Sequence, residues 1–515
     1  MQNTGKPLQK VVIVGGGAAG WMSAAALSAV LKPPYEIRLI ESEEIGIIGV
    51  GEATIPPIRL FNGMAKIDEA EFLKAAQGTF KLGIEFVNWG DVGQRYLHGF
   101  GGVGRESLWP VDFSQYWLRM RALGRAQPID AYVISNMAAK ANKFMLPQAD
   151  MKNSPLAALG YAYHFDASLY ARHLRSLSEA RGVRRTEGKI VQVLLNEAPG
   201  PTQGHVRAVQ LQSGELVEGD LFLDCSGMVG LLIEKTLETG FEDWSHWLPC
   251  DRAWAVPSES TAPLLPFTRS TAHQAGWQWR IPLQHRVGNG HVFSSRHMSD
   301  DEAAAVLLRK LDAPALAEPR LIKFRTGMRK QAWNRNVVAI GMSAGFVEPL
   351  ESTALHLIQM GVIKLIEAFP HQGFDPVEMA EYNRQNRMRY ESVRDFIVLH
   401  YHLNQRDDSA GLGFWKACAE MGIPESLRWR MELYGASGRL MYVDGDLFRE
   451  PSWLEVMEGQ NLRPKGWLAL AELQGVEETA HYLKGVSDTI ANCVAVMPDH
   501  AEFIRQYCAA PPMKG

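Results

Sequence analysis

The sequence predicts an α/β fold in which a doubly wound parallel sheet is followed by a mostly helical C-terminal part. Three observations lead to this prediction. The chain opens with β-branched residues that run into a glycine-rich turn and then into small residues typical of a helix. Further apolar strands end in small-residue turns at 220–225 and 336–340, where a doubly wound sheet presents ligand contacts. From about residue 376 onward the pattern is helical, without a strand run of convincing length.

The first element is the segment VVIVGGGAAGWM, Val11 to Met22. Gly15 permits a tight turn after the strand, Gly17 lets the backbone approach a pyrophosphate, and Gly20 allows helix and strand to pack closely. The helix that follows directs unpaired N–H groups and the positive end of its dipole at the phosphates. Glu41 ends the next apolar strand at the distance expected for the acid that binds a ribose hydroxyl. The sequence therefore predicts a dinucleotide site, and the loop alone does not decide which dinucleotide.

Composition narrows the class of partner. The 515 residues are 46% hydrophobic, and the net charge of -4 gives no general attraction to nucleic acid or to anionic lipid. The uncharged run from Val11 to Leu31 resembles a membrane anchor, but its glycines and the motif completed by Glu41 argue against one. The five cysteines are scattered, odd in number and without metal-ligand spacing. A soluble protein of the reducing cytoplasm, without a metal centre, is therefore expected.

The next segments are a loop, a helix and an aromatic insertion. Ile45 to Ile58 is a glycine-punctuated loop whose backbone can approach a flat ligand, with an ordinary connection as the alternative. Apolar residues at helical spacing predict a helix from Asp68 to Trp89, with Lys81 at the edge of its apolar stripe as a snorkelling surface lysine. Residues of about 90–180 are rich in aromatics and glycine and suggest an insertion that lines a site. Within it, His98 is expected to be a turn residue satisfied by the backbone.

Strand signals return at 189–195, 206–211 and 220–225. Cys225 ends the last of these strands, and no base lies near it in the sequence. A packed thiol is therefore expected at this position rather than a nucleophile.

The segment GWQWRIPL, Gly276 to Leu283, is a further short strand. Alternation places Trp277, Trp279 and Ile281 on one face, and Pro282 stops the strand. Two tryptophans on one strand face indicate either a ridge of the core or a wall beside a ligand.

The strand 336–340 leads into a loop and a helix that is predicted to begin at Ser352 as its N-cap. The N–H groups of Ser352, Thr353 and Ala354 then face outward with the helix dipole behind them, so a small anion is expected there. Glu348 and Glu351 flank this helix start, where a carboxylate is also stabilised as a plain capping charge. The remaining chain is predicted to form helices at 377–398, 412–421, 427–434, 467–473, 476–493 and 501–508.

Taken together, the motifs GGGAAGW, VGEATIP, the Trp, Trp, Ile, Pro pattern and GFVEPLEST resemble the flavin-dependent tryptophan and indole halogenases in this order. The glycine loop is common to many flavoproteins, whereas the tryptophan pattern together with EPLEST is specific. The resemblance extends to about residue 370 and more loosely beyond. It implies a glutathione-reductase-like FAD-binding module at 1–370, an inserted substrate-side segment at about 90–180, and a helical substrate-binding cap at 371–515.

The same resemblance implies FAD as the cofactor, supplied reduced by a separate NAD(P)H-dependent flavin reductase. Reduced FAD, O2 and halide then give hypohalous acid, which passes to Lys81 and halogenates an electron-rich arene with the help of Glu351. Halide binding is expected at Ser352, Thr353 and Ala354, where the family often has glycine at the last position. The residues expected to hold the cofactor are Gly15, Gly17, Ala18, Ala19, Gly20, Glu41, Glu52, Ala53, Thr54, Ile190, Asp224, Gly341, Ser343 and Phe346.

Trp277, Trp279, Ile281 and Pro282 are expected to shield the flavin from organic substrate. The C-terminal region that grips the amino acid backbone in tryptophan-specific members corresponds here to PSWLEVMEG, which lacks a tyrosine pair. Free indole or another electron-rich arene is thus expected on the same footing as tryptophan. Trp453 is a candidate for stacking on the arene, with a core tryptophan as the alternative.

Two other functions compete with halogenation. A flavin monooxygenase hydroxylating an aromatic substrate can use the same sheet module, but the two tryptophans of the shielding strand argue against it. A non-catalytic flavin-binding sensor or scaffold is disfavoured by the presence of both Lys81 and Glu351. The sequence leaves open which arene and ring position react, whether chloride or bromide is preferred, and whether the protein is a homodimer.

Overall fold

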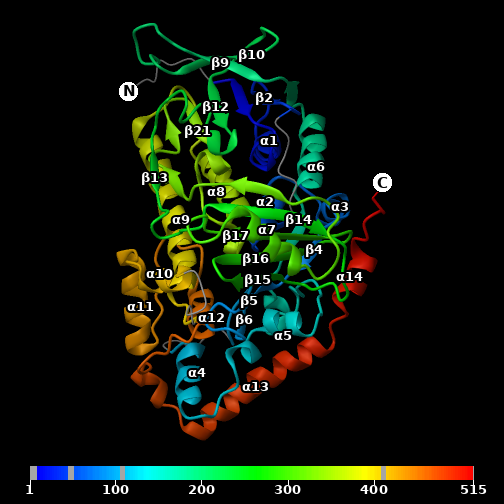
Figure 1. The fold of residues 1–515 in the computed structure, drawn as a ribbon, viewed down its shortest axis with the longest axis vertical. Helices are drawn as coiled ribbons and strands as arrows, with labels where there is room; N and C mark the ends of the chain where they lie inside the picture. The colour runs from blue at the N-terminus through cyan, green and yellow to red at the C-terminus, as the bar shows by residue number, and fades with distance from the viewer. Residues whose placement is uncertain (1–7, 45–50, 105–110, 407–412, 514–515) are drawn as a thin grey trace.

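A parallel sheet forms the upper part of the protein in Figure 1, in the order β20-β21-β12-β1-β2-β8. The structure is a computed structural model that describes residues 8–44, 51–104, 111–406 and 413–513. All neighbouring strands of this sheet pair in parallel except β20 with β21. The strands are β1 (Lys10–Val14), β2 (Glu36–Glu41), β8 (Arg184–Glu187), β12 (Leu221–Asp224), β20 (Trp333–Asn334) and β21 (Val337–Ala339).

Helix α1 (Ala18–Val30) packs against α6 (Ala167–Ala180) and α8 (Ala354–Glu367) beside this sheet. Ten of its residues are buried, among them Trp21 and Leu27, which explains why the run of small residues carries so little charge. The predicted mixed α/β fold with a parallel sheet is confirmed.

A second, seven-stranded sheet lies below the first in Figure 1, in the order β18-β14-β17-β16-β15-β5-β6. It is antiparallel except for the β15–β5 pair. Its strands are β5 (Gly83–Val87), β6 (Arg95–Gly99), β14 (Arg252–Ser258), β15 (Thr268–His273), β16 (Gly276–Pro282), β17 (Val287–Phe293) and β18 (Arg320–Lys323).

The remaining strands form three small sheets. β3 (Gly51–Ala53), β7 (Ala162–Asp166) and β4 (Thr79–Lys81) pair in that order. β9 (Ile190–Leu195), β10 (Val206–Leu211) and β11 (Leu216–Glu218) form a meander at the top of Figure 1. The third small sheet contains β13 (Phe241–Asp243), β19 (Gly327–Arg329) and β22 (Gly345–Phe346).

Within the described part of residues 376–513 the chain forms helices and no strand, as predicted. They are α9 (Pro376–His402), α10 (Phe414–Glu420), α11 (Glu425–Ser437), α12 (Glu450–Gly459), α13 (Val476–Ala495) and α14 (His500–Tyr507). The expected helix at 467–473 is only the 3-10 turn Ala469–Glu472, and the start of the expected helix at 412 lies outside the described residues. The N-terminal helices are α2 (Ile58–Met64), α3 (Glu69–Ala75), α4 (Phe113–Ala122), α5 (Ile134–Lys140) and α7 (Asp300–Arg309).

The predicted helix from Asp68 to Trp89 is wrong beyond its first two turns. Helix α3 ends at Ala75, Gln77 adopts a left-handed φ of 54°, and the chain continues as β4 and β5. Phe80, Ile84 and their neighbours recur at a spacing that suits a buried helix, but alternate positions of two short buried strands are apolar too. Lys81 therefore lies on a strand inside the protein, and not on a helix surface.

The predicted glycine loop at 45–58 is described only from Gly51, where β3 begins, while residues 45–50 lie outside the described residues. Residues 105–110 of the aromatic insertion also lie outside them.

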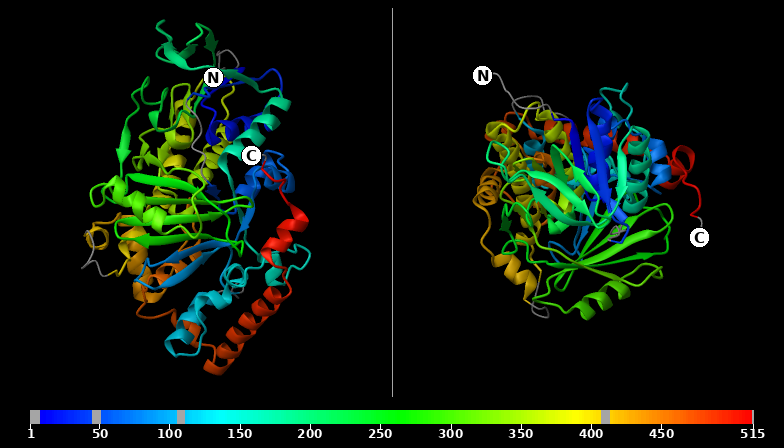
Figure 2. Two further views of the ribbon diagram at one scale, coloured as in Figure 1. Left: turned by 45° about the vertical axis from the view of Figure 1, so that its right-hand side comes forward. Right: turned by 90° about the horizontal axis from the view of Figure 1, so that it is seen from above.

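Two apolar clusters hold the fold together, and the C-terminal helices contribute to both. One contains Val12 and Leu223 of the parallel sheet together with Ile504 of α14. The other contains Trp277 of the second sheet and Met457 of α12. Figure 2 shows α13 and α14 running along one side of the molecule while α9 to α11 lie on another. The C-terminal helices thus brace both sheets.

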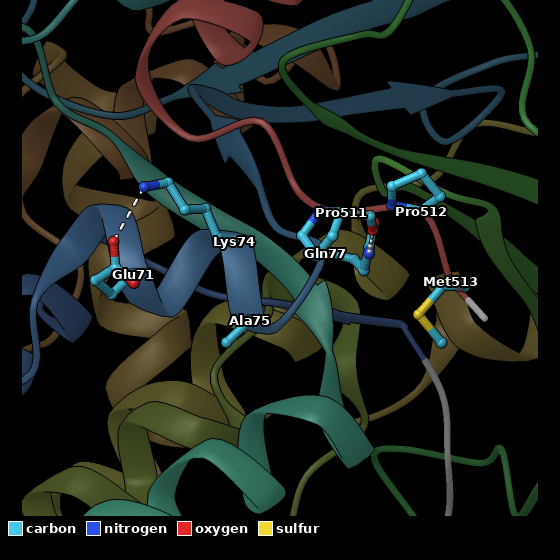
Figure 3. Close-up of a pocket in the computed structure, with 7 residues that line it drawn as sticks. All are labelled: Glu71, Lys74, Ala75, Gln77, Pro511, Pro512 and Met513. Carbon is cyan, nitrogen blue, oxygen red and sulfur yellow. Dashed lines mark hydrogen bonds and ion pairs between the residues drawn. The ribbon is translucent and has the colours of Figure 1, made fainter.

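None of the described helices is long and apolar enough to cross a membrane. A surface hollow of about 440 Å³ lies between α3 and the C-terminal tail (Figure 3). Gln77 Nε2 donates to the carbonyl of Pro511 across it, 2.8 Å away. None of the predicted site residues lines this hollow.

Candidate active site

The glycine turn after β1 has the geometry that its sequence predicts. Gly15 adopts a φ of 111°, and a Cβ there would lie 2.3 Å from the carbonyl oxygen of Cys225. A Cβ on Gly20 would lie 1.8 Å from the carbonyl oxygen of Gly15, so helix and turn touch. A Cβ on Gly17 would meet nothing within 4 Å. This glycine faces open space at the start of α1, where a diphosphate can approach the backbone.

Glu41 ends β2, as predicted, and its carboxylate lies beside the glycine turn. It accepts hydrogen bonds from Trp21 Nε1 at 3.2 Å and from Arg185 Nε at 2.5 Å. Arg185 carries no motif in the sequence, because it meets Glu41 only through the pairing of β8 with β2. The Glu41 carboxylate is thus paired with a guanidinium from the neighbouring strand.

Asp224 and Ser343 shape the backbone around the site. The Asp224 carboxylate accepts from Ser226 N and Oγ and from the N–H groups of Leu232 and Ile233, at 2.6–3.0 Å. Four bonds use most of the capacity of a carboxylate, so this side chain folds the loop after β12. Ser343 Oγ donates to the Asp224 carbonyl.

The other predicted cofactor residues are distributed as follows. Gly341 begins the turn beside α1, and a Cβ there would lie 2.9 Å from the Cβ of Ala19. Ala18 and Ala19 form the first turn of α1; Glu52 and Ala53 belong to β3, and Thr54 follows it with its hydroxyl donating to the Tyr163 carbonyl. Ile190 and Phe346 are half-buried on β9 and β22. Cys225 is a buried thiol in contact with Ser23 Oγ, and burial raises its pKa, which confirms the packed thiol.

Lys81 is completely buried, with an exposed fraction of 0%. Its Nζ donates to the carbonyl oxygen of Thr54 at 3.0 Å and to Ser352 Oγ at 2.8 Å, and it lies 5.2 Å from the centre of the Phe100 ring. Burial lowers the pKa of this amine to about 7, although the charge of Glu351 works in the opposite direction. Near neutral pH the side chain is therefore present both as ammonium and as amine.

Glu351 is the last residue of a 3-10 turn, Pro349–Glu351, and is 1% exposed. Its Oε2 lies 2.9 Å from His98 Nδ1, and its Oε1 lies 2.9 Å from His400 Nε2. Burial works to raise the pKa of this carboxyl, but the two adjacent histidines outweigh burial and lower it to about 2. The expectation that Glu351 is a capping charge is therefore wrong, as is the one that His98 is a turn residue.

The turn after Glu351 corrects the prediction for Ser352. Ser352 has a left-handed φ of 59°, and its N–H donates to the Pro349 carbonyl at 3.0 Å. Thr353, not Ser352, is the N-cap of α8, and Ala354 is its first residue. The Ser352 N–H is therefore engaged within the turn. The Thr353 hydroxyl is buried and has no hydrogen-bond partner among the described residues.

Strand β16, which carries Trp277 and Trp279, makes hydrogen bonds to residues that are close to Lys81 and Glu351 along the chain. Trp277 Nε1 donates to Glu348 Oε2 at 2.9 Å, and Tyr401 OH donates to the same oxygen at 2.7 Å. Glu348 is thus a buried acceptor and not a capping charge, and burial raises its pKa to about 7. Thr79 Oγ1, two residues before Lys81, donates to the Pro282 carbonyl at 2.8 Å.

Trp279 lies over Gly290, where an added Cβ would come within 2.0 Å of its ring. Its indole N–H is buried and has no acceptor in the part of the chain that the structure describes. Ile281 is buried as well, so every side chain of the predicted shielding group faces the interior.

Trp453 lies on α12 and is 1% exposed. Its Nε1 donates to the Phe448 carbonyl at 3.2 Å, and its ring meets Phe396 edge-on at 4.9 Å. Phe396 also contacts the rings of His98 and His400. Trp453 is therefore separated from the two histidines by one aromatic ring.

The structure therefore combines an α/β fold with a lysine and a glutamate that are both fully buried. The sequence profile of the family described as tryptophan halogenase matches residues 10–475, and the chain belongs to this family. The resemblance inferred from the motifs is thereby confirmed.

Similar proteins of known class cover between 83% and 99% of the chain. Tryptophan 7-halogenase KtzQ of Kutzneria sp. (strain 744) is 36% identical over 451 residues, which are 83% of this chain and 82% of that protein. The structure of Xcc4156, a flavin-dependent halogenase from Xanthomonas campestris, is 46% identical with a TM-score of 0.94, covering 99% of this chain and 100% of that chain. BrvH, a flavin-dependent halogenase from Brevundimonas sp. BAL3, is 43% identical with a TM-score of 0.92, covering 98% and 99%. The family is one of flavin-dependent oxidoreductases.

Proposed function

We propose that this protein is an FADH2-dependent halogenase that chlorinates or brominates an electron-rich arene such as indole or tryptophan. The observation that carries the proposal is the position of the Lys81 amine. It is fully buried and donates to Ser352 Oγ, and Ser352 is the residue that follows Glu351 along the chain. Residues 1–370, including the insertion at about 90–180, form the cofactor module, and 371–515 form the substrate-binding cap.

The residues present fit FAD. Gly17 offers open space at the start of α1, and the buried polar atoms Thr353 Oγ1 and Trp279 Nε1 lack partners among the described residues, which is the condition expected where a polar ligand completes a site. When bound and reduced by a separate NAD(P)H-dependent reductase, FAD supplies the activation of O2 that oxidises halide to hypohalous acid. The residues that would hold it are those of the glycine turn, Glu41, β3 with Thr54, Ile190, the 341–343 turn and Phe346, with Asp224 shaping the loop.

The halide binds at the N-terminus of α8. Thr353 and Ala354 begin this helix, and the positive end of the helix dipole favours an anion there. Ser352 contributes its hydroxyl to Lys81 instead, because its own N–H is engaged with Pro349.

Lys81 then reacts with hypohalous acid or binds it. As an amine it reacts with hypohalous acid, HOX, forming an N–X bond with loss of water, and the haloamine passes X⁺ to the arene. As an ammonium it donates a hydrogen bond to the oxygen of HOX and polarises the O–X bond. The pKa of about 7 makes both forms available near neutral pH.

Glu351 supports the attack on the arene. Positive charge develops on the ring as X⁺ adds, and a buried carboxylate stabilises that charge. Glu351 also accepts the ring proton when the arene regains aromaticity.

Strand β16 and the C-terminal cap control which molecules reach Lys81 and Glu351. Trp277, Trp279, Ile281 and Pro282 keep the organic substrate away from the cofactor, so that direct hydroxylation is suppressed. Trp453 stands behind Phe396 as part of the aromatic wall of the arene pocket.

The test is a product mass spectrum from one reaction. Purified protein is supplied with FAD, a flavin reductase, NADH, chloride and bromide together, and a mixture of arenes including indole and tryptophan. Halogenated arene is expected, which also identifies the preferred arene and halide; omission of both halides is the control. Hydroxylated arene without halogenated product contradicts the proposal, as does rapid oxidation of NADH by the protein alone.

A further inference from the structure

The carboxylate of Glu351 lies between two imidazoles that come from distant parts of the chain. His98 belongs to β6 and His400 to the C-terminal half of α9, and the ring of Phe396 on α9 contacts that of His98. The side chains of His98, Glu351 and His400 are 3%, 1% and 0% exposed. The protons at both contacts are therefore governed by these three buried side chains and the groups bonded to them.

Hydrogen bonding decides which nitrogen of His400 carries a proton. His400 Nδ1 lies 2.8 Å from the carbonyl oxygen of Phe396, which only accepts, so Nδ1 is protonated. A neutral ring then presents the bare lone pair of Nε2 to Glu351 Oε1 at 2.9 Å, which sets two acceptors against each other. A flipped ring would place carbon atoms at both contacts. One further proton is therefore required between Nε2 and Oε1.

The contact of His98 with Glu351 requires no additional proton. Its Nδ1 donates to Glu351 Oε2 at 2.9 Å, and the neutral tautomer with a proton on Nδ1 satisfies this contact. The second histidine is thus the one that carries the additional proton. The His400 contact is not aligned as a hydrogen bond, and neither of its atoms has another partner among the described residues, so charge is what holds it.

We propose that His400 is a positioning residue that holds this proton as an imidazolium against the Glu351 carboxylate and thereby sets the protonation of Lys81. The proposal rests on the proposed halogenase function for its consequence, but not for the proton itself. Because the imidazolium balances the carboxylate, Lys81 meets little net negative charge, and its neutral amine is maintained. Loss of the imidazolium exposes the amine to an unbalanced carboxylate, which favours the ammonium.

None of the other titratable groups around His98, Glu351 and His400 takes over the role of the positive charge that we assign to His400. They are Lys81 on β4, Tyr96 on β6, Glu455 on α12, and Glu348 and Tyr401 beside the trio in the turn and in α9. Burial raises the pKa of Tyr96, Tyr401 and Glu455, so their charged forms are disfavoured. Glu348 has a pKa of about 7, as Lys81 does, but it is bonded to Trp277 and Tyr401.

The activity test compares His400→Gln with His402→Gln. Glutamine keeps an N–H donor toward Glu351 but carries no charge, and His402 is a partly exposed histidine on the same helix. In H400Q we expect the pH at which the halogenation rate rises to increase by about one pH unit. This shift corresponds to a tenfold change in the ratio of amine to ammonium at Lys81. The rate of hypohalous acid formation should not change. H402Q should match the wild type. Repeating the profiles with Glu348→Gln in each background removes the other group that titrates in this range.

An unchanged limb in H400Q overturns the proposal, and so does a rate that falls equally at every pH, because that result shows a neutral hydrogen bond or a packing role. The proton itself is tested without activity, by ¹⁵N NMR of histidine-labelled protein at about pH 7. The ring signals that disappear in H400Q, or in H400F should H400Q not fold, are expected to be those of a doubly protonated ring. Signals of a neutral Nδ1–H ring overturn the proposal, whether or not the protein proves to be a halogenase.

Discussion

Lys81 Nζ donates to Ser352 Oγ at 2.8 Å, although the two residues are 271 positions apart in the sequence. The contact joins strand β4 to the turn that carries Glu351, and it holds the amine inside the protein. Ser352 itself adopts a left-handed φ of 59°, a conformation that costs a residue other than glycine roughly 1–2 kcal/mol. Strained residues of this kind cluster at active sites, which agrees with the role proposed for this turn.

Replacement of Ser352 by alanine or by glycine should separate its two roles. Both variants remove the hydroxyl that accepts from Lys81, so halogenation should fall by about tenfold or more in both, since a hydrogen bond to a charged group contributes ~1.5–3 kcal/mol. Ser352→Gly should be more stable than Ser352→Ala by about 1 kcal/mol, because glycine adopts the left-handed region without strain. Thermal unfolding and product formation measure the two effects. Equal stability of the two variants contradicts the strain, and full activity in either contradicts the contact.

Gly17 and Gly20 provide a second matched pair. A Cβ on Gly20 would lie 1.8 Å from the Gly15 carbonyl oxygen, so Gly20→Ala should lower the free energy of unfolding by about 1–3 kcal/mol. A Cβ on Gly17 meets only open space, so Gly17→Ala should leave unfolding unchanged and weaken FAD binding by about tenfold. Thermal unfolding without cofactor and a fluorescence titration with FAD separate these outcomes. Undiminished FAD affinity in Gly17→Ala argues that the diphosphate lies elsewhere.

Glu348 should make stability depend on pH. Its pKa is raised from 4.5 to about 7 in the folded protein, so between these values the folded state binds more protons than the unfolded state. Stability therefore falls as pH rises through this window, by on the order of 3 kcal/mol from this group. Glu348→Gln keeps an acceptor for Trp277 and Tyr401 but does not titrate, so the loss between about pH 5 and about pH 8 should be smaller. Urea unfolding at both pH values measures the difference, and parallel curves for variant and wild type refute it.

The local patterns of the sequence predicted the parallel sheet and its glycine turn because their causes are local. Gly20 is required by the close approach of α1 to the Gly15 carbonyl oxygen, Gly15 by the left-handed φ of the turn, and Glu41 follows from the length of the next strand. The apolar pattern around Lys81 predicts a helix where the structure has strands, because a buried segment is apolar at both spacings. Gln77 gives no sign in the sequence of the left-handed turn that separates α3 from β4.

The roles of Lys81 and Glu351 came from the resemblance of the motifs and not from their surroundings. Nothing near Glu351 in the sequence indicates that His98 and His400 lie on its two oxygens, because those contacts join β6, a short turn and α9. The one available signal for His400 is its position within the apolar segment FIVLHYH, where a buried histidine requires a polar partner. Glu348 was likewise given a capping role, since its bond to Trp277 exists only in the folded chain.

The central claim, that Lys81 transfers the halogen, is tested most directly by Lys81→Ala with Lys74→Ala as the control. Lys74 is a surface lysine on α3 that pairs with Glu71. Each variant is supplied with reduced FAD, O2, bromide and the preferred arene, and both the halogenated arene and the hypohalous acid released to a trap are measured. We expect Lys81→Ala to form hypohalous acid at the wild-type rate without halogenated arene at the enzyme's own ring position, and Lys74→Ala to match the wild type. Arene halogenation by Lys81→Ala at the wild-type rate and position would contradict the account.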